Sequence, residues 1–322
     1  MPKISVIIPV YGVEKYIERC AISLFEQTIN DVEYIFIDDC TTDLSIVILQ
    51  SVIDKYRIRL AAEKKVVRIE KMPSNSGLAA VRRHGVQLST GDYVIHCDSD
   101  DWVDITLYEK MYNSAIENNS DVVITDFIHT DNVHYNIISG GKSNNPEECI
   151  LDMMYRKMWW TVWNKLFRRN LISDTFIYPC YAMGEDMVIT LQLMSKCRRI
   201  SYVKKVYYYY FINSTSISLS MSEKKCMEKF NQLTANYSIV KDYFLSLSNA
   251  SHYTKGLHYL DFYVAEPLEP LLFLDKYFRI WKQKISGTEI KVMLNSSVHI
   301  KYRIKALLIY LGVYRFVKRI TL

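Results

Sequence analysis

Residues 91–102 read GDYVIHCDSDDW, a short apolar strand that runs directly into three carboxylates, those of Asp98, Asp100 and Asp101. Carboxylates crowded in this way repel one another unless a cation or a basic partner lies between them. Mg²⁺ and Mn²⁺ bind through one or two carboxylates and complete their shell with water and the phosphate oxygens of a substrate. The stretch therefore predicts a metal ion that bridges the protein to a phosphate. The alternative is an acidic turn that caps the next helix, because Asp is a good N-cap residue.

The residues before this stretch alternate short β-branched runs with longer amphipathic ones, which is the pattern of βαβ units and a parallel sheet. In open parallel sheets, ligands bind beyond the carboxyl ends of the strands. We therefore expect residues 9–11, the pair Asp38-Asp39 and residues 98–100 to converge on one crevice. The predicted strands are residues 4–9, 32–37, 66–70 and 93–97, and the predicted helices are 14–26, 44–56 and 78–88.

The pattern changes after Asp101. A helix is predicted over residues 106–118, a strand over 122–126 and a loop over 139–146, where glycine, asparagine and proline gather. Four consecutive tyrosines at 207–210 are typical of a strand. Beyond about residue 222 the chain becomes helical and aromatic, without obvious chemistry.

Composition limits the class of protein. With 322 residues, 49% of them hydrophobic, the chain can bury a full core and lies between one large α/β domain and two smaller ones. Its seven cysteines are scattered and include no CxxC pair, so neither a zinc site nor a disulfide framework is indicated, and a reducing cytoplasm fits best. The apolar run at residues 4–10 is too short for a signal peptide, so none is expected, and no uncharged apolar run approaches the roughly 18 residues that span a bilayer.

The net charge of +5 is a local feature of the C-terminus. Residues 290–322 hold seven of the basic residues and no acid, and the rest of the chain is slightly acidic, so no nucleic-acid partner is expected. A helix over residues 301–319 would place apolar residues on one face with cations near both ends, which suits an anionic membrane surface. The alternative is a terminal helix that packs on the protein's own core. The predicted apolar face consists of Ile304, Leu307, Leu308 and Leu311.

Six motifs together resemble the family 2 glycosyltransferases, which are nucleotide-sugar enzymes of bacterial capsule, lipopolysaccharide and exopolysaccharide synthesis. The resemblance covers roughly residues 3–220, in the expected order and spacing. It implies an α/β fold of the GT-A type, Rossmann-like, with a mostly parallel central sheet and a helical C-terminal extension. The motifs are SVIIPVY at 5–11, FIDDCTTD at 36–43, NSGLAAVR at 75–82, DSDD at 98–101, WNKLF at 163–167 and GED at 184–186.

The resemblance implies a catalytic domain over residues 1–220, with a nucleotide-sugar half at 1–105 and an acceptor half at 106–220. Residues 221–322 form the helical region. Within the first half, the family pattern assigns nucleotide contacts to Pro9, Val10, Tyr11, Asp38, Asp39, Arg82, Asp98 and Ser99. Asp39 is expected to accept hydrogen bonds from the uracil, and Arg82 to face the diphosphate. Asp98 and Asp100 match the metal-binding pair, with Mn²⁺ or Mg²⁺ as the cofactor.

The same pattern assigns the catalytic base to Asp186, with Glu185 beside it. One base that takes the acceptor hydroxyl proton in a single displacement inverts the anomeric configuration. From local sequence alone, two acids in the first turn of a helix are also explained by the helix dipole. Residues 216–218 match the end of the family's catalytic region. Four positions depart from the pattern, namely Gly12, Cys40, Arg83 and Phe211; Cys40 replaces a glycine that normally permits an unusual backbone turn.

Two further motif residues have open interpretations. Trp163 and its neighbours Trp159 and Trp160 fit either an aromatic platform for a sugar ring or core packing. Lys165 is expected to be an ordinary surface lysine, and the alternative is contact with an acceptor phosphate. His96 is expected to be a strand residue and not a metal ligand.

The predicted function is transfer of a sugar from a UDP-sugar to a glycan or lipid-linked saccharide, in the cytoplasm or on the inner face of the plasma membrane. A sugar nucleotidyltransferase and a non-catalytic nucleotide-sugar-binding protein are the alternatives. The first is disfavoured because no glycine-rich phosphate loop follows residues 4–9. A dehydrogenase is disfavoured because the sequence contains no GxGxxG.

Overall fold

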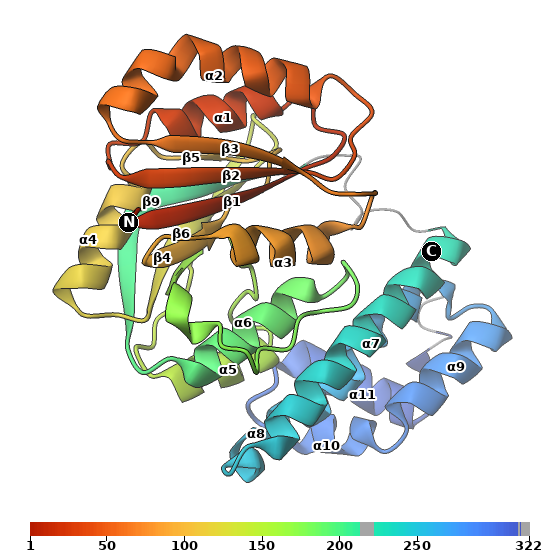
Figure 1. Ribbon diagram of the computed structural model, residues 1–322. Helices are drawn as coiled ribbons and strands as arrows, with labels where there is room; N and C mark the ends of the chain where they lie inside the picture. Colours follow the sequence, from red (N-terminus) through yellow and green to blue (C-terminus); the bar gives the residue numbers. More distant parts are fainter. Residues whose placement is uncertain (213–221, 315, 317–322) are drawn as a thin grey trace. The chain divides into compact units, whose positions relative to one another are not determined.

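The computed structural model describes residues 1–212, 222–314 and 316 (Figure 1). The chain divides into two compact units. The first unit holds residues 1–149, 160–178 and 192–214, and the second holds 150–159, 179–191 and 215–322. The chain therefore passes between the units several times, and the division at residue 220 stays a prediction.

A mixed sheet of nine strands runs through the described part of the first unit in the order β3-β2-β1-β4-β8-β6-β9-β5, with β7 paired to β6. The neighbours β3, β2, β1 and β4 are parallel, as the alternating pattern predicts. β8 is antiparallel to both of its neighbours, and β6 and β9 are again parallel. The α/β class is thus confirmed. The strands are β1 Ile4–Val10, β2 Val32–Asp38, β3 Val66–Lys71, β4 Tyr93–His96, β5 Trp102–Val103, β6 Val122–Thr130, β7 Tyr135–Ile138, β8 Lys165–Arg168 and β9 Ile200–Phe211.

Helices cover both faces of the parallel strands (Figure 1). Alternate side chains of a strand point to opposite faces, so a strand covered on both sides must be apolar throughout. Val6 and Ile8 of β1 pack in one core with α1, whereas Ile35 and Ile37 of β2 pack on the other face with Val81 of α3. This explains why β1 and β2 read as continuous apolar runs. The helices of this part are α1 Ile17–Phe25, α2 Ser45–Ala62, α3 Leu78–Leu88 and α4 Leu107–Glu117, and a short 3₁₀ helix, η1, spans Arg169–Leu171.

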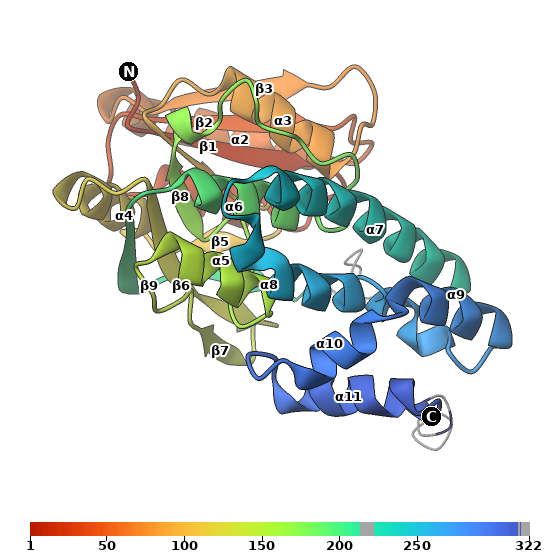
Figure 2. The ribbon, with the colours of Figure 1, turned by 90° about the horizontal axis from the view of Figure 1, so that it is seen from below.

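The second unit is helical and has its own aromatic core. Tyr259, Phe262 and Trp281 are buried together there. α10 packs on α8 and on α11, as Figure 2 shows. No helix of the described residues combines the length and the apolarity that a membrane span needs. The remaining helices are α5 Pro146–Met154, α6 Glu185–Lys196, α7 Glu223–Ser246, α8 Ala250–Tyr263, η2 Glu266–Leu271, α9 Asp275–Ile285, α10 Thr288–Leu294 and α11 Ile300–Tyr310.

Candidate functional site

The carboxyl ends of β1 and β2 lie side by side. Val10 and Asp38 are partners in the parallel register, and the backbone N–H of Asp39 donates to the Val10 carbonyl at 3.0 Å. β4 pairs with the other side of β1, and the Cys97 N–H donates to the Ile7 carbonyl at 2.9 Å. The structure thus brings the three predicted strand ends to one edge of the sheet.

Asp39 fastens a second loop to this edge. Its two carboxylate oxygens accept the N–H groups of Ser76 and Gly77, at 2.7 and 2.9 Å, and its side chain is buried. Because each carboxylate oxygen has two lone pairs, Asp39 retains capacity for a further donor. Asp38 is also buried and accepts the Thr41 N–H at 2.8 Å, which closes a local turn.

The other residues expected around the base differ in exposure. Val10 is fully buried, Pro9 is half-buried and Tyr11 exposes 56% of its surface. Tyr11 is therefore the member of this group whose ring is accessible to a ligand. The next residue, Gly12, donates its N–H to the Thr41 hydroxyl at 2.9 Å, so the two loops are joined here as well.

Cys40 has the backbone conformation that its position predicts. Its φ is 58°, in the left-handed region, and its thiol donates to the Met72 carbonyl at 3.1 Å. A residue with a Cβ atom pays about 1–2 kcal/mol there. The turn after Asp38 and Asp39 is therefore strained, because it holds Cys40 where the family pattern has glycine.

Cys40→Gly should therefore stabilise the protein. We expect the free energy of unfolding to rise by about 0.5–1 kcal/mol, because relief of the strained φ exceeds the entropy that glycine adds to the unfolded chain. Urea denaturation measures this difference. Cys40→Ala is the control, since it removes the thiol and keeps the strain; an alanine variant as stable as the glycine variant would contradict the explanation.

The buried Arg82 forms an ion pair with the partly exposed Asp98 in the first unit. Arg82 lies in the second turn of α3, its side chain is 3% exposed, and its Nη2 lies 2.7 Å from Asp98 Oδ1. His96, two residues earlier on β4, is fully buried, and burial together with Arg82 lowers the pKa of its imidazole well below the usual value. His96 is the last residue of β4, so its predicted place in a strand is confirmed.

The remaining carboxylates of the stretch differ in their surroundings. Asp101 is 1% exposed, and its two oxygens accept the Tyr208 hydroxyl at 2.6 Å and the Phe211 N–H at 2.7 Å. Burial, with the neighbouring Asp100 and Asp98, raises the pKa of Asp101 well above its usual range. Tyr208 also accepts the Asp98 N–H at 2.9 Å. Asp101 therefore fixes the turn to β9, while Asp100 stays half-buried and Ser99 is buried.

Arg19 also contacts the turn at residues 100–102, which the sequence analysis did not predict. Its guanidinium carbon lies 3.6 Å from the centre of the Trp102 ring, and Nη2 donates to the Asp100 carbonyl at 3.0 Å. Trp102 in turn stacks on Tyr209, with ring centroids 5.1 Å apart. A cation over an indole face is the strongest of the cation–π pairs. No local signal marks Arg19, because its partners lie far along the chain.

Glu185 and Asp186 belong to the second unit and open α6. Glu185 is 3% exposed, Asp186 is half-buried, and the Met187 N–H donates to Asp186 Oδ1 at 2.8 Å. The preceding Gly184 has a φ of 79°, which a residue with a Cβ rarely adopts. A Cβ there would also lie 2.6 Å from Leu233 on α7, so the motif glycine has a structural reason.

A family model described as Glycosyl transferase family 2 matches residues 5–185, which is more than half of the chain. The chain belongs to this family. The motifs that carry the resemblance lie within that range, apart from the last residue of GED.

Curated relatives agree with this placement of the family 2 chain. The poly(ribitol-phosphate) beta-glucosyltransferase of Bacillus spizizenii is 31% identical over 227 residues, which are 68% of this chain and 34% of that protein. The putative glycosyltransferase EpsH of Bacillus subtilis is 29% identical over 236 residues, 70% of this chain and 65% of that protein. The family 2 chain thus spans about a third to two thirds of the length of these relatives.

Solved structures confirm the GT-A-type fold. Crystalline S. aureus TarS 1-349 in complex with UDP matches with a TM-score of 0.70 at 22% identity, over 98% of this chain and 90% of that one. The mannosyltransferase PcManGT from Pyrobaculum calidifontis, in complex with GDP-Man and Mn2+, gives a TM-score of 0.51 at 13% identity, over 95% and 86% of the two chains. At these levels of sequence identity, the two matches show that the folds are similar and nothing more.

The carboxylates of residues 98–101 are of the chemical kind that a divalent ion such as Mg²⁺ accepts as ligands. In the part of the chain that the structure describes, no cluster of three or more His, Cys, Asp or Glu side chains could hold a metal ion. Asp101 is committed to β9, which leaves the carboxylates of Asp98 and Asp100. Two carboxylates with water and diphosphate oxygens are the usual shell of Mg²⁺.

All five residues of the WNKLF motif, at 163–167, are buried. Lys165 was expected at the surface, and this is wrong: it is 3% exposed, and its Nζ donates to the Thr161 carbonyl and to Asn164 Oδ1, at 2.7 and 2.8 Å. The reason is that Lys165 begins β8, an interior strand of the sheet. Trp163 is buried and stacks on Tyr208, with ring centroids 4.3 Å apart, so it packs in the core. Residues 216–218 lie outside the described residues.

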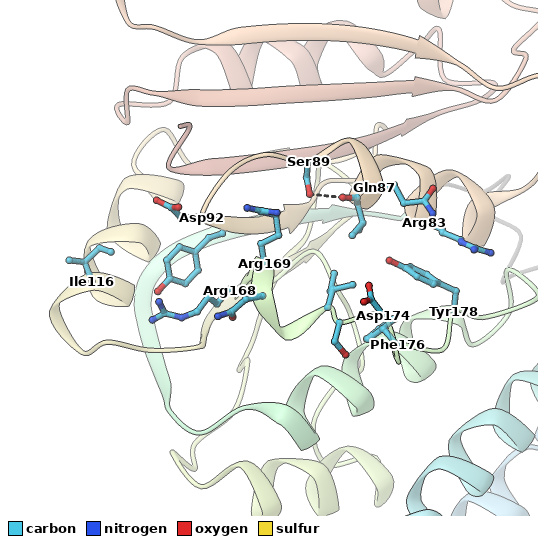
Figure 3. A pocket seen from close by; sticks show the side chains of 15 residues that line it. Arg83, Gln87, Ser89, Asp92, Ile116, Arg168, Arg169, Asp174, Phe176 and Tyr178 are labelled. Carbon is cyan, nitrogen blue, oxygen red and sulfur yellow. Dashed lines mark hydrogen bonds between the residues drawn. The ribbon is translucent and has the colours of Figure 1, made fainter.

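A groove of about 650 Å³ lies beside α3 in the first unit. Figure 3 shows Arg83 and Gln87 of α3 on one side and Asp174, Phe176 and Tyr178 on the other. The residues that line it include none of those predicted to bind the nucleotide or the metal. Arg83 stacks over Tyr178 at 5.1 Å, whereas its neighbour Arg82 faces Asp98. The groove is therefore separate from the donor residues.

Proposed function

We propose that this chain is an inverting, metal-dependent glycosyltransferase that moves a sugar from a UDP-sugar to a glycan acceptor, one linked to a lipid, in bacterial surface-polysaccharide synthesis. The observation that carries the proposal is the meeting of three strand ends at one edge, with Arg82, which pairs with Asp98, in the helix that follows the residues held by Asp39. The names of the relatives, among them a poly(ribitol-phosphate) glucosyltransferase, support transfer of a sugar.

The donor half would use the residues of the first unit. Asp39 accepts a hydrogen bond from the uracil, Tyr11 covers the base, and Pro9, Val10, Asp38 and Ser99 shape the pocket. Arg82, held by Asp98, presents a fixed positive charge to the diphosphate. Asp98 and Asp100 would hold Mn²⁺ or Mg²⁺, which supplies further neutralisation of the leaving diphosphate when it is bound.

The acceptor half would use Asp186. Its carboxylate takes the proton of the acceptor hydroxyl as that oxygen bonds to the anomeric carbon. The bond from that carbon to the diphosphate breaks at the same time, UDP leaves with the electron pair, and the configuration inverts. Glu185 is the neighbouring acid of the same turn and is proposed to support the base.

The test is to incubate the full chain and Mn²⁺ with a panel of nucleotide sugars, with and without glycan acceptors, and to measure the released nucleotide. We expect UDP from UDP-sugars, and an inverted anomeric signal in the product by NMR. Pyrophosphate exchange with a sugar phosphate would instead show a nucleotidyltransferase. Tight UDP binding with no turnover of any member would favour the non-catalytic alternative.

We also propose that the C-terminal helix rests on an anionic membrane surface at the inner face of the plasma membrane. α11 docks on the second unit's core through Ala306 and Ile309, and Lys305 is buried beside Glu266. The opposite side is apolar and exposed: Ile300, Ile304, Leu307 and Leu311 each expose between 39% and 60% of their surface. Lys301 is exposed next to this face, and Arg303 is half-buried there. Such a face with cations near it suits anionic lipid headgroups.

Replacing Ile304 and Leu311 together by glutamine should lower binding to phosphatidylglycerol vesicles at least tenfold, because about 0.8 kcal/mol is lost per buried methylene. Point changes are preferred to deletion of the tail, because α11 contributes to the core. Vesicle co-sedimentation measures the affinity. Ile58→Gln on α2, where the side chain is 83% exposed, is the matched control. Equal binding by the double variant and the control would contradict the proposal.

A further inference from the structure

Asn236 lies in α7, a helix to which the sequence analysis assigned no catalytic or binding residue. Its side chain is fully buried in the second unit. Its Oδ1 accepts the N–H groups of Cys180 and Tyr181, at 3.0 and 3.4 Å. Its Nδ2 donates to the carbonyls of Tyr181 and Met183, at 2.7 and 2.9 Å. One amide side chain thus uses both donors and both acceptor lone pairs on a single short segment of backbone.

Two neighbours on the same face of α7 contact this segment as well. Gln232, one turn before Asn236, accepts the Met183 N–H at 3.1 Å through Oε1 and donates to Glu228 at 3.2 Å. Leu233 lies against Gly184, where any Cβ would be 2.6 Å away. Residues i and i+4 share a helix face, so α7 presents Gln232 and Asn236 as adjacent polar groups. The two amide side chains together form hydrogen bonds with backbone groups of Cys180, Tyr181 and Met183.

This segment leads directly into Glu185 and Asp186. Cys180 and Tyr181 are exposed and residues 182–184 are half-buried, so the fully buried amide of Asn236 anchors the backbone of an irregular segment that lies at the surface. The left-handed Gly184 then turns the chain into α6, so the direction of the first helical turn depends on where residues 180–183 are fixed. The side chain of Asp186 projects from that turn.

From this geometry we infer that Asn236, assisted by Gln232, is a positioning residue for the base Asp186. The inference rests on the proposed function, in which Asp186 takes the acceptor proton. The helical C-terminal region would then contribute to the reaction indirectly, because α7 positions Asp186 without contacting the substrate. A displacement of about 1 Å in a reacting group costs about 10²-fold in rate.

The variant Asn236→Ala should lower kcat about 10²-fold while the KM for the UDP-sugar and the Kd for UDP stay within twofold, since the residues proposed to bind the donor lie in the first unit. Gln232→Leu, which removes the hydrogen bond from the Met183 N–H and the one to Glu228 at a half-buried position, should lower kcat about tenfold. Ser238→Ala is the matched control, an exposed side chain on the same helix that donates only to the Thr234 carbonyl. UDP-binding stoichiometry by calorimetry reports the folded fraction of each variant.

A double-mutant cycle with Asp186→Asn separates positioning from a purely structural role. If Asn236 acts through Asp186, adding Asn236→Ala to Asp186→Asn leaves the residual single-turnover rate unchanged, because the two effects are not additive. A further 10²-fold fall in the rate of the double variant would overturn the inference. It would also be overturned if, in both Asn236→Ala and Gln232→Leu, kcat fell by no more than the number of UDP-binding sites measured by calorimetry. Full activity of Asp186→Asn alone would instead refute the base assignment, so the two failures are distinguishable.

Discussion

Asp186→Asn should lower the rate of sugar transfer by 10³-fold or more and leave UDP binding unchanged. Asparagine keeps the size of the side chain but cannot take a proton, so the acceptor hydroxyl must be deprotonated by water. General bases contribute roughly 10²–10⁴-fold. The loss should appear in kcat at saturating acceptor, because the substitution removes proton transfer to Asp186, which occurs only in the transition state.

The measurement is steady-state transfer from a UDP-sugar, with calorimetry for UDP. Asp242→Asn, an exposed carboxylate on α7, is the control for loss of one negative charge in the second unit. Glu185→Gln tests the neighbouring acid, which is almost fully buried. Near-normal turnover by Asp186→Asn together with a large loss in Glu185→Gln would move the base to Glu185.

The donor side of the site could be predicted from the sequence because its residues follow from local patterns. A strand reveals itself by its apolar run, and the residues just beyond it must lie at the strand's carboxyl end. Asp38, Asp39 and Asp98 each follow such a run, and parallel pairing then brings them to one edge. The unusual backbone of Cys40 was also foreseeable, since the residue stands where a glycine is usual.

Other features depend on contacts between distant segments, and no local pattern encodes them. Arg19 reaches the Asp100 carbonyl across more than eighty residues of sequence, and Asn236 lies more than fifty residues beyond the loop that it holds. Lys165 looked like a surface residue because lysines are rarely buried. Its burial follows from the position of β8 between two other strands, which only the sheet order defines.

Asp100→Ala should abolish the effect of Mn²⁺ on UDP affinity. In the proposed site the ion is shared between Asp98, Asp100 and the diphosphate, so Mn²⁺ should tighten UDP binding to the natural chain by about 10–100-fold, in line with a few kcal/mol of charge neutralisation. In the variant, the Kd for UDP measured with Mn²⁺ should equal the Kd measured without it. Titration of Mn²⁺ by electron paramagnetic resonance, with UDP present, reports the ion directly.

Asp100 is the better position for this test than Asp98. Asp98 pairs with the almost fully buried Arg82, so removing the Asp98 carboxylate takes a charge partner from a buried guanidinium and costs stability. A loss of UDP binding in an Asp98 variant could therefore result either from lost metal binding or from a change in the position of Arg82. Asp100 is half-buried and accepts the Arg19 hydrogen bond through its backbone carbonyl, so the turn keeps that hydrogen bond when the side chain is removed. UDP binding to the natural chain that ignores Mn²⁺, and that Asp100→Ala leaves intact, would exclude the metal bridge and leave Arg82 as the cation that faces the leaving diphosphate.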